Sequence, residues 1–232
     1  MRGITYNGQD SIKDFDLYIS DLNISPPTKR QVRVDIPFMN GSYNFSNLFG
    51  ESTFNERELV YSFDIIGNSV EDLNFKKIRI YKWLMGCGEI ELYDSAIEGY
   101  YFLAECVSIR ESDEREYSFI EVTFKAQPFK IRDEFEGNNL WDTFNFELDV
   151  LQERTFTVSG TEEFTMYNNG LVSEIPLIKS SVSGLKIIFN NIEYILEKGD
   201  NRLSNIRLVP GNNAFKLVGN GTIEIYFNSE VI

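Results

Sequence analysis

Short segments in which apolar and other residues alternate recur along most of this chain. Val32, Val34 and Ile36 alternate with charged residues, and the same period of two recurs in 59–65 and 120–124. In a strand this period puts every second side chain on one face. The pattern predicts a mostly β chain whose strands each bury one face, including the strand around Val34. Nineteen phenylalanines and twelve tyrosines also favour sheet over helix.

One segment has a helical period instead. Six residues fall on a single stripe at three- and four-residue spacing: Val70, Leu73, Lys77, Ile78, Tyr81 and Leu84. Ser69 suits an N-cap, and Gly86 and Gly88 suit the end of the helix. We therefore expect one helix of about four turns packed against a sheet.

Charged and turn-forming residues with little to bury mark a boundary near 132–139. We expect two domains: 1–133, an α+β domain (a β-sandwich with one helix), and 134–232, an antiparallel β-sandwich. The nearly all-charged segment Glu111–Glu116 is expected to be an exposed hairpin loop.

Two turn sequences in the second half predict hairpins. Asn190–Asn191 separates the apolar segments 185–189 and 192–196. Gly219–Asn220–Gly221 separates a second pair, 215–218 and 222–227.

The absence of histidine excludes several kinds of chemistry. A chain without histidine has no Ser-His-Asp or Cys-His nucleophile and no mononuclear His-ligated metal. Cys87 and Cys106 are too few for a disulfide framework or a Cys-type zinc site, so we expect two free thiols. No phosphate-binding or nucleophile motif is present. We expect a protein that is not an enzyme and needs no cofactor or metal.

The charge balance disfavours nucleic acids and membranes as partners. Thirty-six acidic residues against 22 basic ones give a formal net charge of −14. Such a surface repels phosphate backbones and anionic lipids. The amino terminus lacks the residue order of a signal peptide, and no apolar run approaches the length of a membrane span. We expect synthesis in the cytoplasm.

Two sets of residues admit a functional and a structural interpretation. Glu89 and Glu91 could form a catalytic carboxylate pair, but two carboxylates flanking Ile90 on a strand are more simply a solvated face. The aromatic side chains of Trp141, Phe144 and Phe146 could stack on a sugar ring, but packing of a linker against a domain is favoured.

An ordered set of motifs resembles the phage distal tail proteins of siphophages that infect Gram-positive hosts. In the first domain these are Val32–Ser46, Phe49–Gly50, Arg57–Phe63, the segment 83–102 and the closing segment 122–129. In the second half, 208–213 and 219–227 resemble the carboxy-terminal galectin-like sandwich of that family. The likeness covers nearly the whole chain in the right order.

The resemblance implies a virion protein at the tail tip, with a homo-hexameric ring built by the first domain. The ring would join the tail tube protein to the tail-associated lysin or fibre hub, and in some members it carries receptor-binding proteins. DNA would pass through its channel without specific binding. Since the characteristic histidine of galectins is absent, their sugar site is not carried over.

The ring-forming surface is expected in the long segment Pro37–Arg57, because a loop of this length exceeds what a sandwich needs. The candidate interface residues are Pro37, Phe38, Asn40, Tyr43, Phe45, Phe49 and Arg57. Two other functions stay open: a carbohydrate-binding or adhesion module, and an acidic β-sandwich hydrolase.

Overall fold

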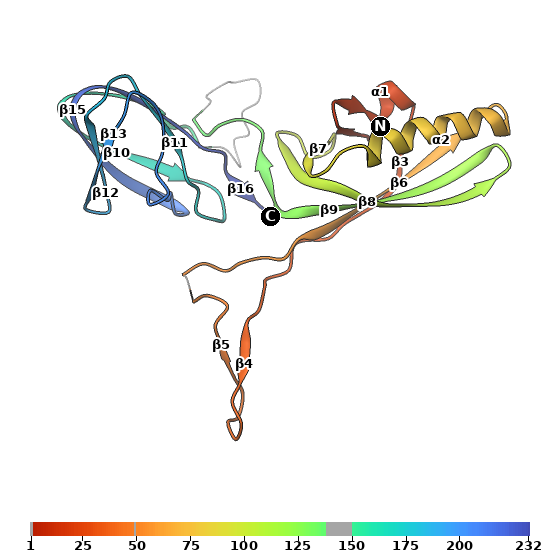
Figure 1. Cartoon of the computed structure of the whole chain (residues 1–232), viewed down its shortest axis with the longest axis horizontal. Coiled ribbons are helices and arrows are strands. Elements are labelled where there is room, and N and C mark those ends of the chain that lie inside the picture. Colours follow the sequence, from red (N-terminus) through yellow and green to blue (C-terminus); the bar gives the residue numbers. More distant parts are fainter. Residues whose placement is uncertain (1, 49, 138–149) are drawn as a thin grey trace. The chain divides into compact units, whose positions relative to one another are not determined.

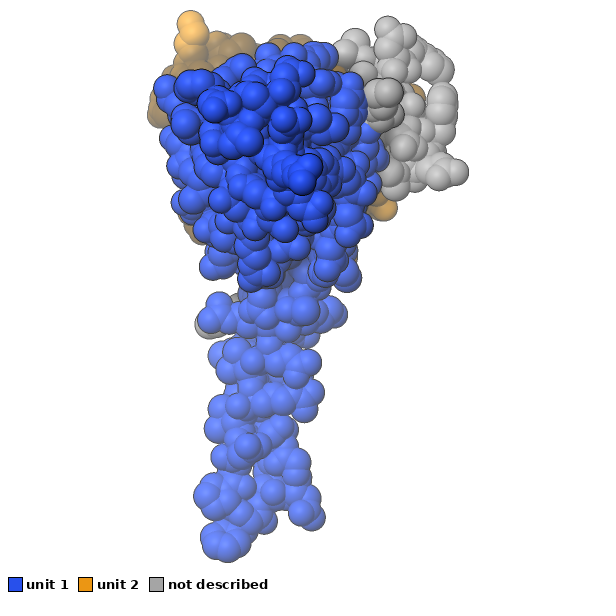
Figure 2. Space-filling view, turned by 90° about the vertical axis from the view of Figure 1, so that its right-hand side faces the viewer, with its two compact units in different colours: residues 1–131, 232 blue, residues 132–231 orange. Residues whose placement is uncertain are grey.

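A computed structural model of the chain describes residues 2–48, 50–137 and 150–232 (Figure 1). The chain divides into two compact units, coloured separately in Figure 2: residues 1–131 with Ile232, and Arg132–Val231. Most of the regular structure is strand, and the strand pairs are antiparallel. The prediction of a mostly β, antiparallel chain with a helix in its first half is confirmed.

Seven strands of the first unit follow one sheet. From edge to edge their order is β2 (Gln9–Asp10), β1 (Ile4–Tyr6), β7 (Ile90–Asp94), β8 (Tyr100–Glu114), β9 (Tyr117–Arg132), β6 (Arg57–Ile66) and β3 (Ile19–Ile24). In the middle of β6, Tyr61 pairs with Leu22 of β3 on one side and with Val122 of β9 on the other. A strand with neighbours on both sides has its backbone hydrogen bonds satisfied within the sheet.

The core of this unit lies between the sheet and helix α2 (Val70–Met85), which runs along one face (Figure 1). Leu59, Tyr61, Phe63 and Ile65 of β6 are each at most 2% exposed. They pack in one cluster with the buried face of α2. The alternation in 59–65 therefore marks a buried face, as predicted.

Helix α2 begins and ends where the sequence predicts. The Ser69 hydroxyl accepts a hydrogen bond from the Asp72 amide at 3.2 Å, and Gly86 is the C-cap. One free amide of the first turn is thereby satisfied.

The predicted stripe of α2 is partly wrong. Val70 and Ile78 are 52% and 62% exposed, whereas Ile80 and Trp83 are buried beside Leu84. The indole Nε1 of Trp83 donates to the Tyr6 carbonyl at 2.6 Å, and this contact fixes which side of the helix faces the sheet. The rotation of the helix about its axis therefore depends on a tertiary contact, which the spacing of apolar residues in the sequence does not reveal.

Lys77, the polar member of the stripe, is 5% exposed. Its Nζ lies 2.9 Å from Glu111 and 2.6 Å from Asp113. Both acids belong to β8, because this strand continues to Glu114 before the chain turns. The expected loop at 111–116 is therefore mostly strand, although its side chains are exposed.

Two amino-terminal features were not predicted. The five-residue helix α1 (Ser11–Phe15) is capped by Asp10, which accepts from the amides of Ile12 and Lys13. The Arg2 guanidinium contacts the 3%-exposed Asp94 through two hydrogen bonds of 2.8 and 2.5 Å. These polar contacts hold the first residues against β7.

The second unit has its own core, formed by apolar residues from Val158 to Phe227. Its strands are β10 (Thr155–Asn168), β11 (Leu177–Ser180), β12 (Leu185–Phe189), β13 (Ile192–Leu196), β14 (Gly199–Arg202), β15 (Gly211–Tyr226) and β16 (Glu230–Val231). The sheet order is β13-β12-β15-β11-β14, and β10 pairs with β15 along its length.

One predicted hairpin of this unit is confirmed and the other is wrong. Asn190 and Asn191 have φ of 51° and 63° and join β12 to β13. In contrast, residues 211–226 form one strand, which bends at Gly219 (φ 131°), directly opposite Gly160 (φ 94°) of β10. A Cβ on Gly219 would lie 2.9 Å from Cδ1 of Leu185. The glycine permits a bend that lets β15 pair first with β12 and then with β11.

Candidate assembly surface

Residues 28–55 form a two-stranded arm, which Figure 2 shows as a narrow extension of the first unit. At its base the Asn55 amide donates to the Thr28 carbonyl at 2.9 Å. Further out, β4 (Arg33–Asp35) pairs with β5 (Ser42–Asn44). None of the described residues of the arm is buried. The arm is therefore held together by backbone hydrogen bonds rather than by a core.

The arm exposes a series of large apolar side chains: Val32, Val34, Ile36, Phe38, Met39, Tyr43, Phe45 and Leu48. Their exposed fractions run from 38% for Met39 to 110% for Phe38. The expectation that Val32, Val34 and Ile36 would have a buried face is wrong, since they are 46%, 47% and 46% exposed. β4 pairs with β5 alone, and no other strand of the described chain adjoins this pair. A concentration of large exposed apolar side chains on one element is typical of an interaction site.

The structure brings five of the seven candidate interface residues onto this arm. Pro37, Phe38 and Asn40 lie between β4 and β5, and Phe38 has a positive φ of 66°. The rings of Tyr43 and Phe45 are 6.2 Å apart.

The other two candidates differ. Phe49 lies outside the described residues, and Arg57 begins β6, where it is 6% exposed. The interface assignment of all seven stays a prediction. Five other exposed apolar residues of the arm were not among the candidates, because alternation indicates a face without showing what covers it: Val32, Val34, Ile36, Met39 and Leu48.

The arm also differs from the rest of the chain in charge. It contains three basic residues, Lys29, Arg30 and Arg33, and two acidic ones, Asp35 and Glu51. The chain as a whole has a net charge of −14. The arm therefore lacks the negative charge of the chain as a whole. Repulsion between like charges does not oppose its contact with an acidic surface.

Aromatic packing attaches the base of the arm to the sheet. The rings of Phe54 and Phe129 meet edge to face with centroids 5.1 Å apart. Lys29 Nζ lies 6.0 Å from the centre of the Phe54 ring. Since Phe129 is part of β9, the arm base packs on the strand that pairs with β6.

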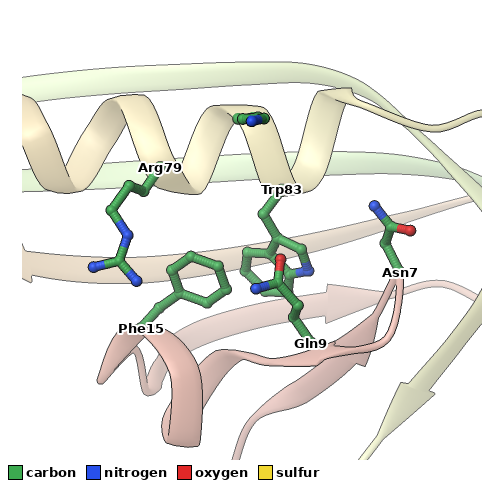
Figure 3. A pocket seen from close by; sticks show the side chains of 6 residues that line it. Asn7, Gln9, Phe15, Arg79 and Trp83 are labelled. Atoms are coloured by element: carbon green, nitrogen blue, oxygen red, sulfur yellow. The ribbon is translucent and has the colours of Figure 1, made fainter.

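A cleft of about 330 Å³ beside α2 is the second feature that could bind a partner (Figure 3). It is lined by Asn7, Gln9, Phe15, Arg79, Lys82 and Trp83. The rings of Phe15 and Trp83 stack at 4.5 Å, and the Arg79 guanidinium lies 5.6 Å from the Phe15 ring. Because the aromatic rings pack on each other, this cleft is explained by the contact between α1 and α2.

The two glutamates considered for catalysis are hydrogen-bonded to different residues. Glu89 accepts a hydrogen bond from Gln127 at 2.7 Å, and Glu91 accepts one from Tyr93 at 3.0 Å. Both carboxylates are exposed. Trp141, Phe144 and Phe146 lie outside the described residues.

Both cysteines are free thiols in the structure. Burial raises the pKa of Cys106 to about 12, so this side chain is a neutral thiol at physiological pH. Within residues 2–48, 50–137 and 150–232, no group of three or more acidic or cysteine side chains is placed to hold a metal ion. None of the helices described there is long and apolar enough to cross a membrane.

Comparison with known proteins places residues 11–140 in the family described as phage tail protein RIFT-related domain. The fold is similar to the crystal structure of the Dit protein of phage SPP1, with a TM-score of 0.72, 15% sequence identity and full coverage of both chains. That protein is described as a paradigm of hub adsorption apparatus in Gram-positive infecting phages. A chain of the phage P2 baseplate matches with a TM-score of 0.41 and 8% identity, over 97% of this chain and 98% of that one. No curated protein matches the chain at a significant level.

Proposed function

Because the chain belongs to the family of phage tail proteins with a RIFT-related domain, we propose that it is a structural distal tail subunit whose arm holds neighbouring copies together in a ring at the tail tip. The first unit would form the ring, and the second would be a galectin-like sandwich attached to it. The role is one of assembly and requires no catalysis.

The exposed apolar arm is the observation that carries this proposal. Its side chains lose contact with water only if another surface covers them, and burial of apolar area is the main favourable term in protein association. Phe38 at the tip is fully exposed, so a contact could bury the largest fraction of its surface among the side chains of the arm. A second copy is a natural cover, because closed rings are built by identical subunits that each present one surface and receive another.

The resemblance in sequence suggests six copies and a place between two partners. On one side would be the tail tube protein, and on the other the tail-associated lysin or fibre hub. Receptor-binding proteins would attach at the same level. The net charge of −14 is compatible with a channel through which DNA passes without being held.

Light scattering after size exclusion tests the proposal on the full chain. We expect a species with six times the 26.9 kDa mass of the chain at micromolar concentration, and a ring in negative-stain images. A matched variant with Val34, Phe38 and Tyr43 changed to serine should remain folded but shift toward the monomer. A wild-type chain that stays monomeric at every concentration tested, alone and with a tail tube protein, would contradict the proposal.

A further inference from the structure

Arg57, at the start of β6, has an unusual environment for a buried cation. It is 6% exposed, and its guanidinium carbon lies 5.2 Å from the centre of the Phe102 ring. Nη1 donates to the Pro128 carbonyl at 3.3 Å. Nε is buried and has no hydrogen-bond partner among the described residues. A buried donor without a partner destabilises the structure that contains it.

Lys130 of β9 provides a second cation at the same place. It is half-buried and lies two residues beyond Pro128, the acceptor for Arg57. Burial lowers the pKa of Lys130, and the charge of Arg57 lowers it further. Burial also lowers the pKa of Arg57. Among the described residues, neither side chain forms an ion pair with a carboxylate.

Among the residues that the structure describes, the other buried cations each have an acidic partner. Lys77, 5% exposed, contacts Glu111 and Asp113. Arg132, 7% exposed, contacts Glu136 at 3.2 Å. Arg57 is the exception among the buried cations described, in a chain that has 36 acidic residues to supply partners. Paired burial is the rule for charged groups because desolvation is offset only by an opposite charge.

We infer that Arg57 and Lys130 form a binding site for the carboxylate of an aspartate or glutamate from a second copy of this chain. A carboxylate at the accessible side of this pair would be attracted by the charge of the Arg57 guanidinium, although Nε itself is shielded from solvent. Lys130 would add a second charge from the neighbouring strand. The inference rests on the proposed ring and names a contact within it.

The position of the site is the reason for choosing a second copy as the source of the carboxylate. Arg57 follows the arm by two residues, and the Phe54–Phe129 contact joins the arm base to the strand of Lys130. A copy that covers the arm as far as its base would lie next to the two cations. Its surface is rich in carboxylates, since acidic residues outnumber basic ones by 36 to 22.

Lys130→Met separates this role from a merely structural one. Removing the half-buried charge of Lys130 relieves its repulsion with Arg57, so the melting temperature of the monomer should rise by a few degrees, while the dissociation constant of the assembly rises at least tenfold. Lys125→Met is the matched control, because Lys125 lies on the same strand, is exposed and pairs with Glu56 at 2.5 Å. It should change neither quantity appreciably.

Carbodiimide coupling, which joins amines to carboxylates in direct contact, identifies the partner group. With mixed ¹⁵N-labelled and unlabelled wild-type chains, we expect Lys130 to be joined to an Asp or Glu of a differently labelled copy. An assembly in which Lys130→Met associates as tightly as wild type, or in which Lys130 couples only within its own copy, overturns this inference and leaves the ring intact. A wild-type chain that never assembles contradicts the proposed function instead. A melting temperature that phosphate raises in wild type but not in Lys130→Met, with unchanged assembly, would assign the site to a free anion and overturn the choice of a second copy.

Discussion

β4 and β6 have the same alternation of apolar and other residues but opposite environments. Phe63 and Leu59 of β6 are completely buried, whereas Val34 of β4 is 47% exposed. β6 has strands on both sides and α2 over one face, while β4 has β5 as its only neighbour. The comparison shows that a period of two specifies an apolar face but does not determine whether another element of the chain covers it.

The largest contrast is expected from truncating one phenylalanine in each region. Phe63→Ala removes a fully buried ring and should lower the free energy of unfolding by about 3–5 kcal/mol. Phe38→Ala removes a fully exposed ring and should change it by less than about 0.5 kcal/mol. Urea denaturation at protein concentrations too low for assembly measures the change in the free energy of unfolding for both variants. Similar losses from the two substitutions would mean that the arm is part of the folded core.

Removing the returning half of the arm should affect assembly more than folding. Deletion of Gly41–Ser52 eliminates β5 and most of the described residues after the tip, and none of the deleted residues described is buried. We expect a chain with a native far-ultraviolet circular dichroism spectrum but with a largely monomeric mass by light scattering. An intact hexamer from this deletion would place the interface outside the arm.

The ion pairs of Lys77 should give a smaller effect that depends on pH. Hydrogen bonds from Tyr81 and Lys77 lower the pKa of Glu111, and the contact with Lys77 lowers the pKa of Asp113. A carboxyl pKa that is lower in the folded state adds stability above the ordinary range near pH 4, and this stability is lost as pH falls through the lowered values. Lys77→Met should therefore lower the free energy of unfolding by about 1 kcal/mol at pH 7. The effect is small because both acids are half-exposed and solvent screens their charges.

The difference between wild type and Lys77→Met should shrink as the pH is lowered from 7 to 3. Lys76→Met is the control, since Lys76 is exposed and lies 3.4 Å from Asp72. At neutral pH, Lys76→Met should lower the free energy of unfolding by less than Lys77→Met does. A Lys77→Met deficit that stays constant down to pH 3 would show that packing, rather than charge, explains the burial of this lysine.

Salt should have the smallest effect. Because each copy has a net charge of −14, repulsion between copies is screened as salt rises through the low range, and assembly should strengthen before it levels off. Apolar contacts of the arm are not weakened by this screening. Analytical ultracentrifugation over a salt series measures the dissociation constant, and an assembly that falls apart on modest addition of salt would indicate a mainly ionic interface.

Features fixed by a few neighbouring residues could be predicted from the sequence. The N-cap at Ser69 and the turn at Asn190–Asn191 were both correct. In each case the side chain or backbone preference acts on residues within one turn of the chain, so no distant partner is needed. The same holds for the fold class, because alternation alone distinguishes strands from helices.

The resemblance in sequence selected a segment for the interface, but not its geometry. Pro37, Phe38 and Tyr43 prove to lie on an exposed arm, whereas Arg57 is buried in the sheet. The Arg57–Lys130 pair could not be predicted, because the two residues lie on different strands 73 positions apart in a sequence where acidic residues are abundant.

The sequence by itself determined local turns, caps and apolar faces, and the tertiary structure decided what those faces meet. Gly219–Asn220–Gly221 has the composition of a hairpin turn, yet it lies inside the long strand β15, where residues 158–160 of β10 pair with it. Asn201 and Asn213 each donate side-chain hydrogen bonds to three carbonyls, including Ile178 and Met166 of the neighbouring strands. The reason is physical: backbone preference acts within a few residues, whereas pairing and burial depend on strands that only folding, or a second molecule, brings together.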